Sequence, residues 1–297
     1  MGVKRARTCV MFAAAFLLLC ACAPVAPAQA RAGDGPGFAE VNGTRLYYEA
    51  RGKGPAVVLI HGGLNDSRLW EAQMKPLSKR FRVVRYDMRG FGRSNAERVE
   101  FSVTEDLRAL LDFLKIEKAT LVGLSLGGIV AADFALEHPE RVERLVLVAS
   151  GLRGAGLPPD EKAAEARRVG EREGPEKYFE AFLQSDMLAG LRTRPRAREL
   201  MRRMMVENYK ANAYISAGYP QSPEPPTARR LGQIKAPTLV VVGSLDGRNL
   251  QTNADTLSKG IPGARKVVIR GASHHPPVET PGEFNRLLLD FLEGKKR

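Results

Sequence analysis

Ser125 is the residue whose setting most directly indicates chemistry, because it stands between two glycines in residues 123–127, Gly-Leu-Ser-Leu-Gly. A turn sharp enough to force a serine into a strained backbone conformation leaves no room for β-carbons two residues to either side. A serine held in this way projects above a sheet and attacks an acyl carbonyl once a base has removed its proton. The same pentapeptide also occurs in ordinary turns, so its meaning depends on partners elsewhere in the chain.

Two further polar residues could supply those partners. Asp246 follows the apolar run 238–242, and His274 follows the run 266–269. An imidazole can accept the serine proton, and a carboxylate can hold that imidazole in the right tautomer. The rival position for the acid lies after the preceding strand, but residues 150–153, Ser-Gly-Leu-Arg, contain no carboxylate. Asp246 is therefore the expected acid.

The spacing of apolar residues predicts the sheet that must position these groups. Eight strand-like runs are expected, at residues 38–41, 44–50, 56–60, 82–86, 120–123, 145–149, 238–242 and 266–269. Asn42-Gly43 is the turn dipeptide of an antiparallel hairpin between the first two runs. The later strands alternate with helical patterns, which predicts an α/β fold with a mostly parallel eight-stranded sheet and helices on both faces. In such sheets, catalytic groups collect at the C-terminal ends of the strands.

Helical patterns cover residues 103–114, 129–137 and 281–292, and Ser102 with Glu105 forms a capping box before the first of them. The alternation stops after residue 149 and resumes near residue 237. The intervening stretch, 151–235, is rich in Glu, Ala, Arg and Met and predicts a helical lid insertion that shapes the substrate pocket. Its larger apolar side chains are expected to form the core of the lid rather than to contact substrate: Tyr178, Phe179, Phe182, Met187, Met201, Met204, Met205 and Tyr209.

The beginning of the chain predicts export. A basic start precedes an apolar segment, 10–21, that is short for a membrane span, and Ala28-Gln29-Ala30 is typical of a cleavage site. Residues 19–22, Leu-Cys-Ala-Cys, resemble instead a bacterial lipoprotein signal, although Cys20 is atypical there. The prediction is a signal sequence over 1–22, lipidation of Cys22 and tethering to the bacterial envelope. The alternatives are removal of 1–30 with release into the periplasm or medium, and an uncleaved anchor.

The predicted domains are a flexible linker over 23–37 and a core formed by 38–150 and 236–297. All three cysteines lie in the leader, so the core holds no thiol nucleophile and no disulfide. With four histidines and no H-E-x-x-H pattern, the sequence gives no support for a metal, and it indicates no other cofactor.

The net charge of +13 is compatible with an ordinary solvated surface or with attraction to anionic substrates and envelope surfaces. No nucleic-acid-binding motif is present. The sequence carries no indication of an oligomeric state. Much of the basic excess falls in the predicted lid, at Arg167, Arg168, Arg192, Arg194, Arg196, Arg198, Arg202 and Arg203.

With the motifs at Ser125, Asp246 and His274 in this order along the chain, residues 40–294 resemble the α/β-hydrolase superfamily. Residues 87–94 are similar to its D-x-R-G-x-G-x-S loop, and residues 271–284 to its segment G-x-x-H-x-x-x-x-E-x-P-x-x-F. The second segment selects His274 rather than His275 as the catalytic histidine, with Glu279 as a landmark. The chain order Ser, Asp, His is also that of the superfamily.

The resemblance implies roles for the backbone and the remaining polar residues. The oxyanion would be bound by the backbone N–H groups of Gly63, in the sequence His-Gly-Gly at 61–63, and of Leu126. His61 is expected to shape that loop rather than to transfer protons. Asp87 and Arg89 are expected to brace a loop as a pair, and Trp70 either lines the acyl pocket or packs the first helix.

The sequence thus predicts an exported serine hydrolase that cleaves carboxylic esters or lactones of small molecules through a Ser125–His274–Asp246 triad. Its subfamily resembles enol-lactonases and perhydrolases. A perhydrolase, an acyltransferase or a carbon–carbon bond hydrolase would use the same triad, and these alternatives stay open. A binding protein without turnover is the alternative from a different class.

Overall fold

The fold is built around one eight-stranded sheet, in a computed structural model that describes Gly2 and residues 34–97, 99–211 and 224–295. The strand order is β1-β2-β4-β3-β5-β6-β7-β8. Only the β1–β2 and β2–β4 pairs are antiparallel. This confirms the mostly parallel eight-stranded sheet predicted from the sequence. The strands are β1 (Gly35–Val41), β2 (Thr44–Arg51), β3 (Ala56–Ile60), β4 (Arg82–Tyr86), β5 (Ala119–Leu124), β6 (Val142–Val148), β7 (Thr238–Gly243) and β8 (Arg265–Ile269).

Helices cover both faces of the sheet, because successive strand residues point to opposite sides. Val58 and Ile60 of β3 belong to a core with α2, α3 and α8, whereas Val57 and Leu59 belong to a core with α1 and α10. The predicted two-sided covering is therefore present. The helices are α1 (Glu71–Leu77), α2 (Val103–Phe113), α3 (Leu126–Glu137), α8 (Arg248–Gly260), α9 (Pro276–Glu279) and α10 (Pro281–Leu292).

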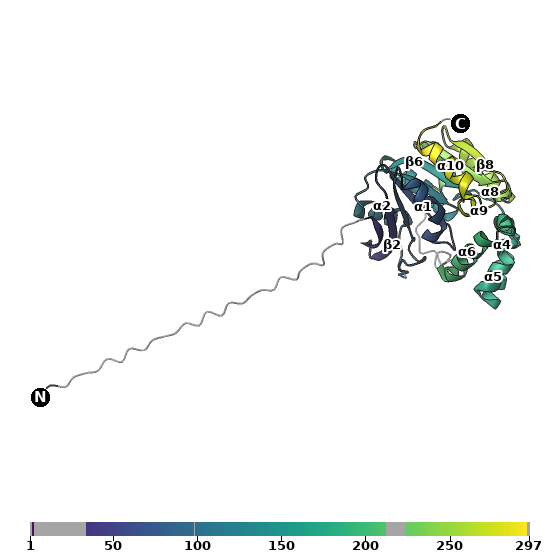
Figure 1. Ribbon diagram of the computed structural model, residues 1–297, viewed down its shortest axis with the longest axis horizontal. Coiled ribbons are helices and arrows are strands. Elements are labelled where there is room, and N and C mark those ends of the chain that lie inside the picture. The colour runs from purple at the N-terminus through teal and green to yellow at the C-terminus, as the bar shows by residue number, and fades with distance from the viewer. Residues whose placement is uncertain (1, 3–33, 98, 212–223, 296–297) are drawn as a thin grey trace. The chain divides into compact units, whose positions relative to one another are not determined.

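Between β6 and β7 the chain forms a group of helices that lies to one side of the sheet (Figure 1). They are α4 (Glu161–Glu173), α5 (Pro175–Phe182), the 3-10 helix η3 (Asp186–Leu191) and α6 (Pro195–Glu207). Tyr178, Phe182 and Met204 are buried and extend the apolar core that α1 and α10 share. The aromatic and methionine residues of this stretch therefore pack largely as core. Residues 212–223 of the predicted lid lie outside the described residues.

The leader is likewise outside the description. Apart from Gly2, the two alternative predicted signal sequences, 1–22 and 1–30, the predicted lipidation site Cys22 and most of the predicted linker 23–37 fall on residues that are not described. In the part of the chain that the structure does describe, no helix combines the length and the apolar character needed to cross a membrane.

Candidate functional site

Ser125 occupies the turn between β5 and α3 with a backbone conformation that side-chain-bearing residues rarely adopt. Its φ is +56° and its ψ is −111°. The Ser125 N–H donates to the Val148 carbonyl at 3.0 Å, and its carbonyl accepts from Gly128 and Ile129 at 3.0 and 3.1 Å. These bonds fix the strained residue between β6 and the first turn of α3. A strained serine at a strand-to-helix turn is the conformation that the pentapeptide predicts.

The glycines around this turn are required by close backbone contacts. A Cβ on Gly123 would overlap the carbonyl of Gly127, and a Cβ on Gly127 would overlap the carbonyl of Ile60. Gly128 is also closely covered, in this case by the Ser150 hydroxyl. The turn can therefore be this tight only because three positions lack side chains.

The loop after β3 lies against Ser125. A Cβ on Gly62 would stand 3.3 Å from the Ser125 Cβ, whereas one on Gly63 would meet no heavy atom within 4 Å. Open space therefore faces Gly63, and both Gly63 and Leu126 are half-buried. Leu64 follows with a φ of +60°, so the loop contains a second strained residue beside the turn at Ser125.

His61 is held in one tautomer by two hydrogen bonds. The Met88 N–H donates to Nε2 at 3.0 Å, so the proton resides on Nδ1, which donates to the Gly62 carbonyl at 2.7 Å. Complete burial lowers the pKa of His61, although the negative charge of Asp87 opposes this decrease. A neutral ring with both nitrogens engaged links two loops and has no free position for proton transfer.

Asp246 and His274 lie on loops that follow β7 and β8, and these loops are joined by backbone hydrogen bonds. The Ser244 N–H donates to the Ile269 carbonyl and the Leu245 N–H to the Ala272 carbonyl, both at 2.9 Å. His274 Nδ1 and Asp246 Oδ1 are 3.9 Å apart, which is beyond hydrogen-bond distance. Both atoms are buried and have no hydrogen-bond partner among the described residues.

Burial controls the protonation of both groups. It raises the pKa of Asp246 to about 7, with the Gly243 N–H opposing this rise and the charge of Glu279 adding to it. Burial lowers the pKa of His274 to about 4. His274 is therefore neutral at pH 7, which is the form that can accept a proton. A shorter contact between the two would stabilise the charged form of each.

Glu279 holds the loop that carries His274. Its Oε2 accepts from the Ser273 N–H at 2.7 Å, and its Oε1 accepts from the Ser273 hydroxyl at 2.7 Å and from the His275 N–H at 3.0 Å. The same Ser273 hydroxyl accepts from the Gly190 N–H of η3 at 3.0 Å. Glu279 was recognised in the sequence only as a landmark, and its anchoring role depends on contacts that the sequence does not display.

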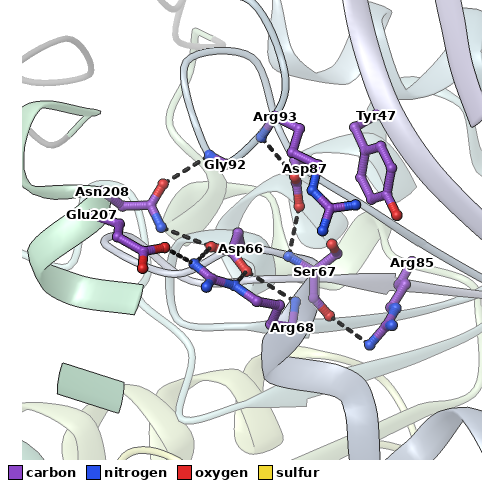
Figure 2. A pocket seen from close by; sticks show the side chains of 10 residues that line it. All are labelled: Tyr47, Asp66, Ser67, Arg68, Arg85, Asp87, Gly92, Arg93, Glu207 and Asn208. Atoms are coloured by element: carbon purple, nitrogen blue, oxygen red, sulfur yellow. Dashed lines mark hydrogen bonds and ion pairs between the residues drawn. The ribbon is translucent and has the colours of Figure 1, made fainter. Parts of the chain in front are cut away.

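The loops after β3 and β4 also make contact with the end of α6. The Gly92 N–H donates to Asn208 Oδ1 at 2.7 Å, Asn208 Nδ2 donates to Asp66 Oδ2 at 2.9 Å, and Arg68 pairs with Glu207 at 2.5 Å. Figure 2 shows these side chains around a cavity of about 300 Å³. Ser125, Asp246 and His274 do not line it. Its charged walls are held by mutual pairing, so it is a polar junction between α6 and the core.

Asp87 and Arg89 brace loops as expected, but not as a pair. Asp87 accepts from the Ser67 N–H at 2.7 Å and from the Arg93 N–H at 2.9 Å. Arg89 instead donates twice to Asp106 of α2, at 2.7 Å each. The predicted partnership was wrong because a carboxylate distant in sequence reaches the guanidinium.

The arginines of the α4–α6 group largely have structural partners. Arg202 pairs with Glu176 and Glu199, and Arg194 donates to the carbonyls of Gly190 and Gly271. These contacts favour the interpretation that the basic residues belong to an ordinary solvated surface and pair within the protein.

Trp70 is fully buried with its ring centroid 6.3 Å from that of Phe284, so it packs α1 against α10. Among the residues that the structure describes, no group of three or more His, Cys, Asp or Glu is arranged to hold a metal.

Comparisons with known proteins agree with this architecture. The family described as alpha/beta hydrolase fold matches residues 55–281. A pimeloyl-[acyl-carrier protein] methyl ester esterase of Aeromonas hydrophila is 31% identical over 255 residues, covering 82% of this chain and 98% of the esterase. The enol-lactonase of Burkholderia xenovorans LB400 is 30% identical, with a TM-score of 0.72 and coverage of 86% of this chain and 100% of that one.

A further relative matches over a shorter stretch. An uncharacterised protein of Mycobacterium tuberculosis is 42% identical over 117 residues, which are 38% of this chain and 34% of that protein. The chain thus spans about a third of the length of this relative.

Proposed function

Because this chain belongs to the α/β-hydrolase fold family, we propose that it is a hydrolase that cleaves carboxylic ester or lactone bonds of small molecules, with Ser125 as nucleophile. The observation that carries the proposal is the strained φ of +56° at Ser125, between glycines that permit it. Strain of this kind at one polar residue is typical of functional sites. Relatives named as an esterase and an enol-lactonase support ester or lactone substrates.

In the proposed reaction, His274 removes the Ser125 hydroxyl proton while the serine oxygen bonds to the acyl carbon. The tetrahedral intermediate collapses as His274 returns that proton to the leaving alkoxide, which gives an alcohol and an acyl-enzyme. Water then attacks the acyl carbon as His274 takes its proton. The bond between the acyl carbon and the Ser125 oxygen breaks as His274 returns that proton to the serine oxygen, which releases a carboxylic acid and free Ser125. With a lactone both products remain one molecule, a hydroxy acid.

The developing negative charge would be met by backbone N–H groups. We assign this role to Gly63, which faces open space beside the nucleophile, and to Leu126, the first residue of α3. The position of Leu126 supports its role because the N-terminal end of a helix presents N–H groups and a favourable dipole to an anion. Removing one such donor typically costs on the order of 10²–10³-fold in kcat.

Asp246 completes the proposed triad by orienting His274. The present 3.9 Å separation has to shorten to about 2.7–3.2 Å for a hydrogen bond. Movement of the His274 ring toward Asp246 would give both unpartnered buried atoms a partner. The charged imidazolium formed during the reaction would then lie beside a carboxylate, which stabilises it.

We also propose that α4, α5, η3 and α6 act as a lid. The support is that η3 contacts the histidine loop: the His274 N–H donates to the Met187 carbonyl at 3.3 Å, and the Gly190 N–H donates to Ser273. Movement of η3 would therefore displace the loop that carries His274. Lids of this kind exclude water and shape the space above the strand ends.

Export, with a lipid tether at Cys22, is a further proposal based on the leader sequence. Metabolic labelling with an alkyne fatty acid in a bacterial host tests it. Wild-type protein should carry the label, and Cys22→Ser should lose it. An unlabelled mature protein that begins after Ala30 would instead support free release.

The function is tested with p-nitrophenyl acetate and butyrate, using purified mature protein and the variant Ser125→Ala. Ser150→Ala is the matched control, because this neighbouring hydroxyl donates only to the carbonyl of Gly151. We expect turnover in wild type and in Ser150→Ala and none above background in Ser125→Ala. Equal rates in folded wild type and Ser125→Ala would exclude the proposed nucleophile.

A further inference from the structure

Asn65, in the loop after β3, carries a buried side-chain amide that is left without partners. The residue is fully buried, with 0% of its surface exposed. Neither Oδ1 nor Nδ2 has a hydrogen-bond partner among the described residues. A buried amide is stabilised only when its donors and acceptor are satisfied, and leaving such a group unpaired typically destabilises the fold.

The Asn65 amide lies close to the proposed nucleophile. A Cβ built on Gly62 would stand 3.1 Å from Asn65 Oδ1 and 3.3 Å from the Ser125 Cβ. The amide and the serine therefore lie on the same side of Gly62. The Asn65 N–H also donates to the Gly62 carbonyl at 3.3 Å, which closes a turn over residues 62–65 and keeps the side chain beside the site.

The rest of this loop is arranged differently. Asp66 accepts from Arg68 and Asn208, and the Ser67 N–H donates to Asp87, so the residues after Asn65 are engaged. Leu64, the residue before it, has the strained φ of +60°. The fold thus maintains an unfavourable backbone conformation at Leu64 next to an unsatisfied amide. Conformational strain combined with an unpaired polar group is characteristic of a site prepared for a ligand.

We propose that Asn65 is a specificity-determining residue that hydrogen-bonds an oxygen atom of the substrate's acyl group near the scissile carbonyl. This inference rests on the proposed function and deepens it. The amide offers two N–H donors and one acceptor oxygen, so it can receive an ether oxygen or a hydroxyl. The preferred substrates are therefore esters or lactones whose acyl part carries an ether oxygen or a hydroxyl, rather than plain alkyl esters.

The test compares wild type with Asn65→Leu, which keeps the approximate shape of the side chain and removes its polar atoms. Two matched substrate pairs are used: p-nitrophenyl butyrate with methoxyacetate, and p-nitrophenyl 3-methylbutyrate with 3-hydroxybutyrate. Within each pair only one carbon is replaced by oxygen. Differences in intrinsic reactivity cancel when the kcat/KM ratio of a pair is compared between the two proteins.

We expect Asn65→Leu to lower the preference for the oxygenated ester about tenfold in at least one pair, the effect of one lost hydrogen bond. Unchanged ratios in both pairs, or an equal loss of activity on every substrate, would overturn the inference. Ser125→Ala run beside them separates the two claims: Ser125-dependent hydrolysis with unchanged ratios leaves the proposed function standing and removes only the role of Asn65.

Thermal unfolding gives a second, independent measurement. Replacing an unsatisfied buried amide by an apolar group of the same shape is neutral or stabilising. The melting temperature of Asn65→Leu should therefore equal or exceed that of wild type. A variant that melts lower or fails to fold would overturn the inference, because the amide would then serve the fold rather than a substrate.

Discussion

Glu279 is the residue whose replacement tests the histidine loop most sharply, because its carboxylate fixes the backbone on both sides of His274. It accepts hydrogen bonds from the Ser273 N–H, the Ser273 hydroxyl and the His275 N–H. Glu279 is itself only 5% exposed. The substitution Glu279→Gln keeps the size of the side chain, so its effect arises from the lost acceptor and charge rather than from a cavity.

The magnitude follows from these contacts. In glutamine one carboxylate oxygen becomes an NH₂ group, which only donates, so at least one of the three donors loses its acceptor. A hydrogen bond to a charged group contributes about 1.5–3 kcal/mol. The free energy of unfolding should therefore decrease by about 2–3 kcal/mol. In a chain of this size the melting temperature should fall by roughly 4–12 °C.

The effect on activity should appear in kcat. A shift of a catalytic group by about 1 Å costs on the order of 10²-fold in rate, so we expect kcat to decrease by about 10–100-fold. KM should change little, because Glu279 contacts the backbone of the histidine loop. Loss of the Glu279 charge should also lower the pKa of Asp246, since that charge contributes to raising it.

Initial rates with p-nitrophenyl butyrate and thermal unfolding measure both effects. Glu283→Gln makes the same substitution on the exposed surface of α10 and serves as the control. Glu279→Asp, which retains the charge on a shorter side chain, should recover part of the lost kcat. A Glu279→Gln enzyme with the kcat and melting temperature of wild type would refute the anchoring role.

Three other measurements bear on the site and its supports. Burial lowers the pKa of His274 to about 4, and the hydrogen bond to Asp246 that the account requires raises it again, so Asp246→Asn should move the acid limb of kcat/KM to lower pH; an acid limb at the same pH in both proteins would contradict this. Asp246→Asn should reduce kcat on the order of 10⁴-fold with an unchanged circular dichroism spectrum, and near-normal turnover would show that another group orients His274. Asn208→Ala removes bonds to Asp66 and Gly92 and should lower the free energy of unfolding by about 2 kcal/mol in urea; an unchanged midpoint would mean that the α6 junction contributes nothing to stability.

The sheet was predictable because its buried strands are nearly continuous apolar runs. Residues 56–60 and 82–86 were predicted with the bounds that β3 and β4 have. The hairpin turn at Asn42 was predictable because Asn-Gly tolerates positive φ, observed here as +47° and +69°. By contrast, β6 begins at Val142, three residues before the prediction, because the exposed Glu143 interrupts the apolar run while remaining in the strand. A prediction from apolar runs therefore misses the end of a strand when a charged residue stands there.

The candidate site could be predicted where a close backbone contact permits only one type of residue. The glycines beside Ser125 are such a case, because any side chain there would overlap a carbonyl. The partner of Arg89, the anchoring by Glu279 and the unpaired amide of Asn65 were not predictable. Each depends on which side chains meet in three dimensions, and a single sequence contains no signal for a hydrogen bond that is made across loops or left unmade.

The central claim, that Ser125 is the nucleophile, is tested most directly by covalent capture. A fluorophosphonate reacts with an activated serine by displacement of fluoride, and tandem mass spectrometry locates the phosphonyl group. We predict one modification per chain, on Ser125, with its rate strongly reduced in His274→Ala. Modification of a different residue accompanied by loss of activity, or full esterase activity in Ser125→Ala, would contradict the account.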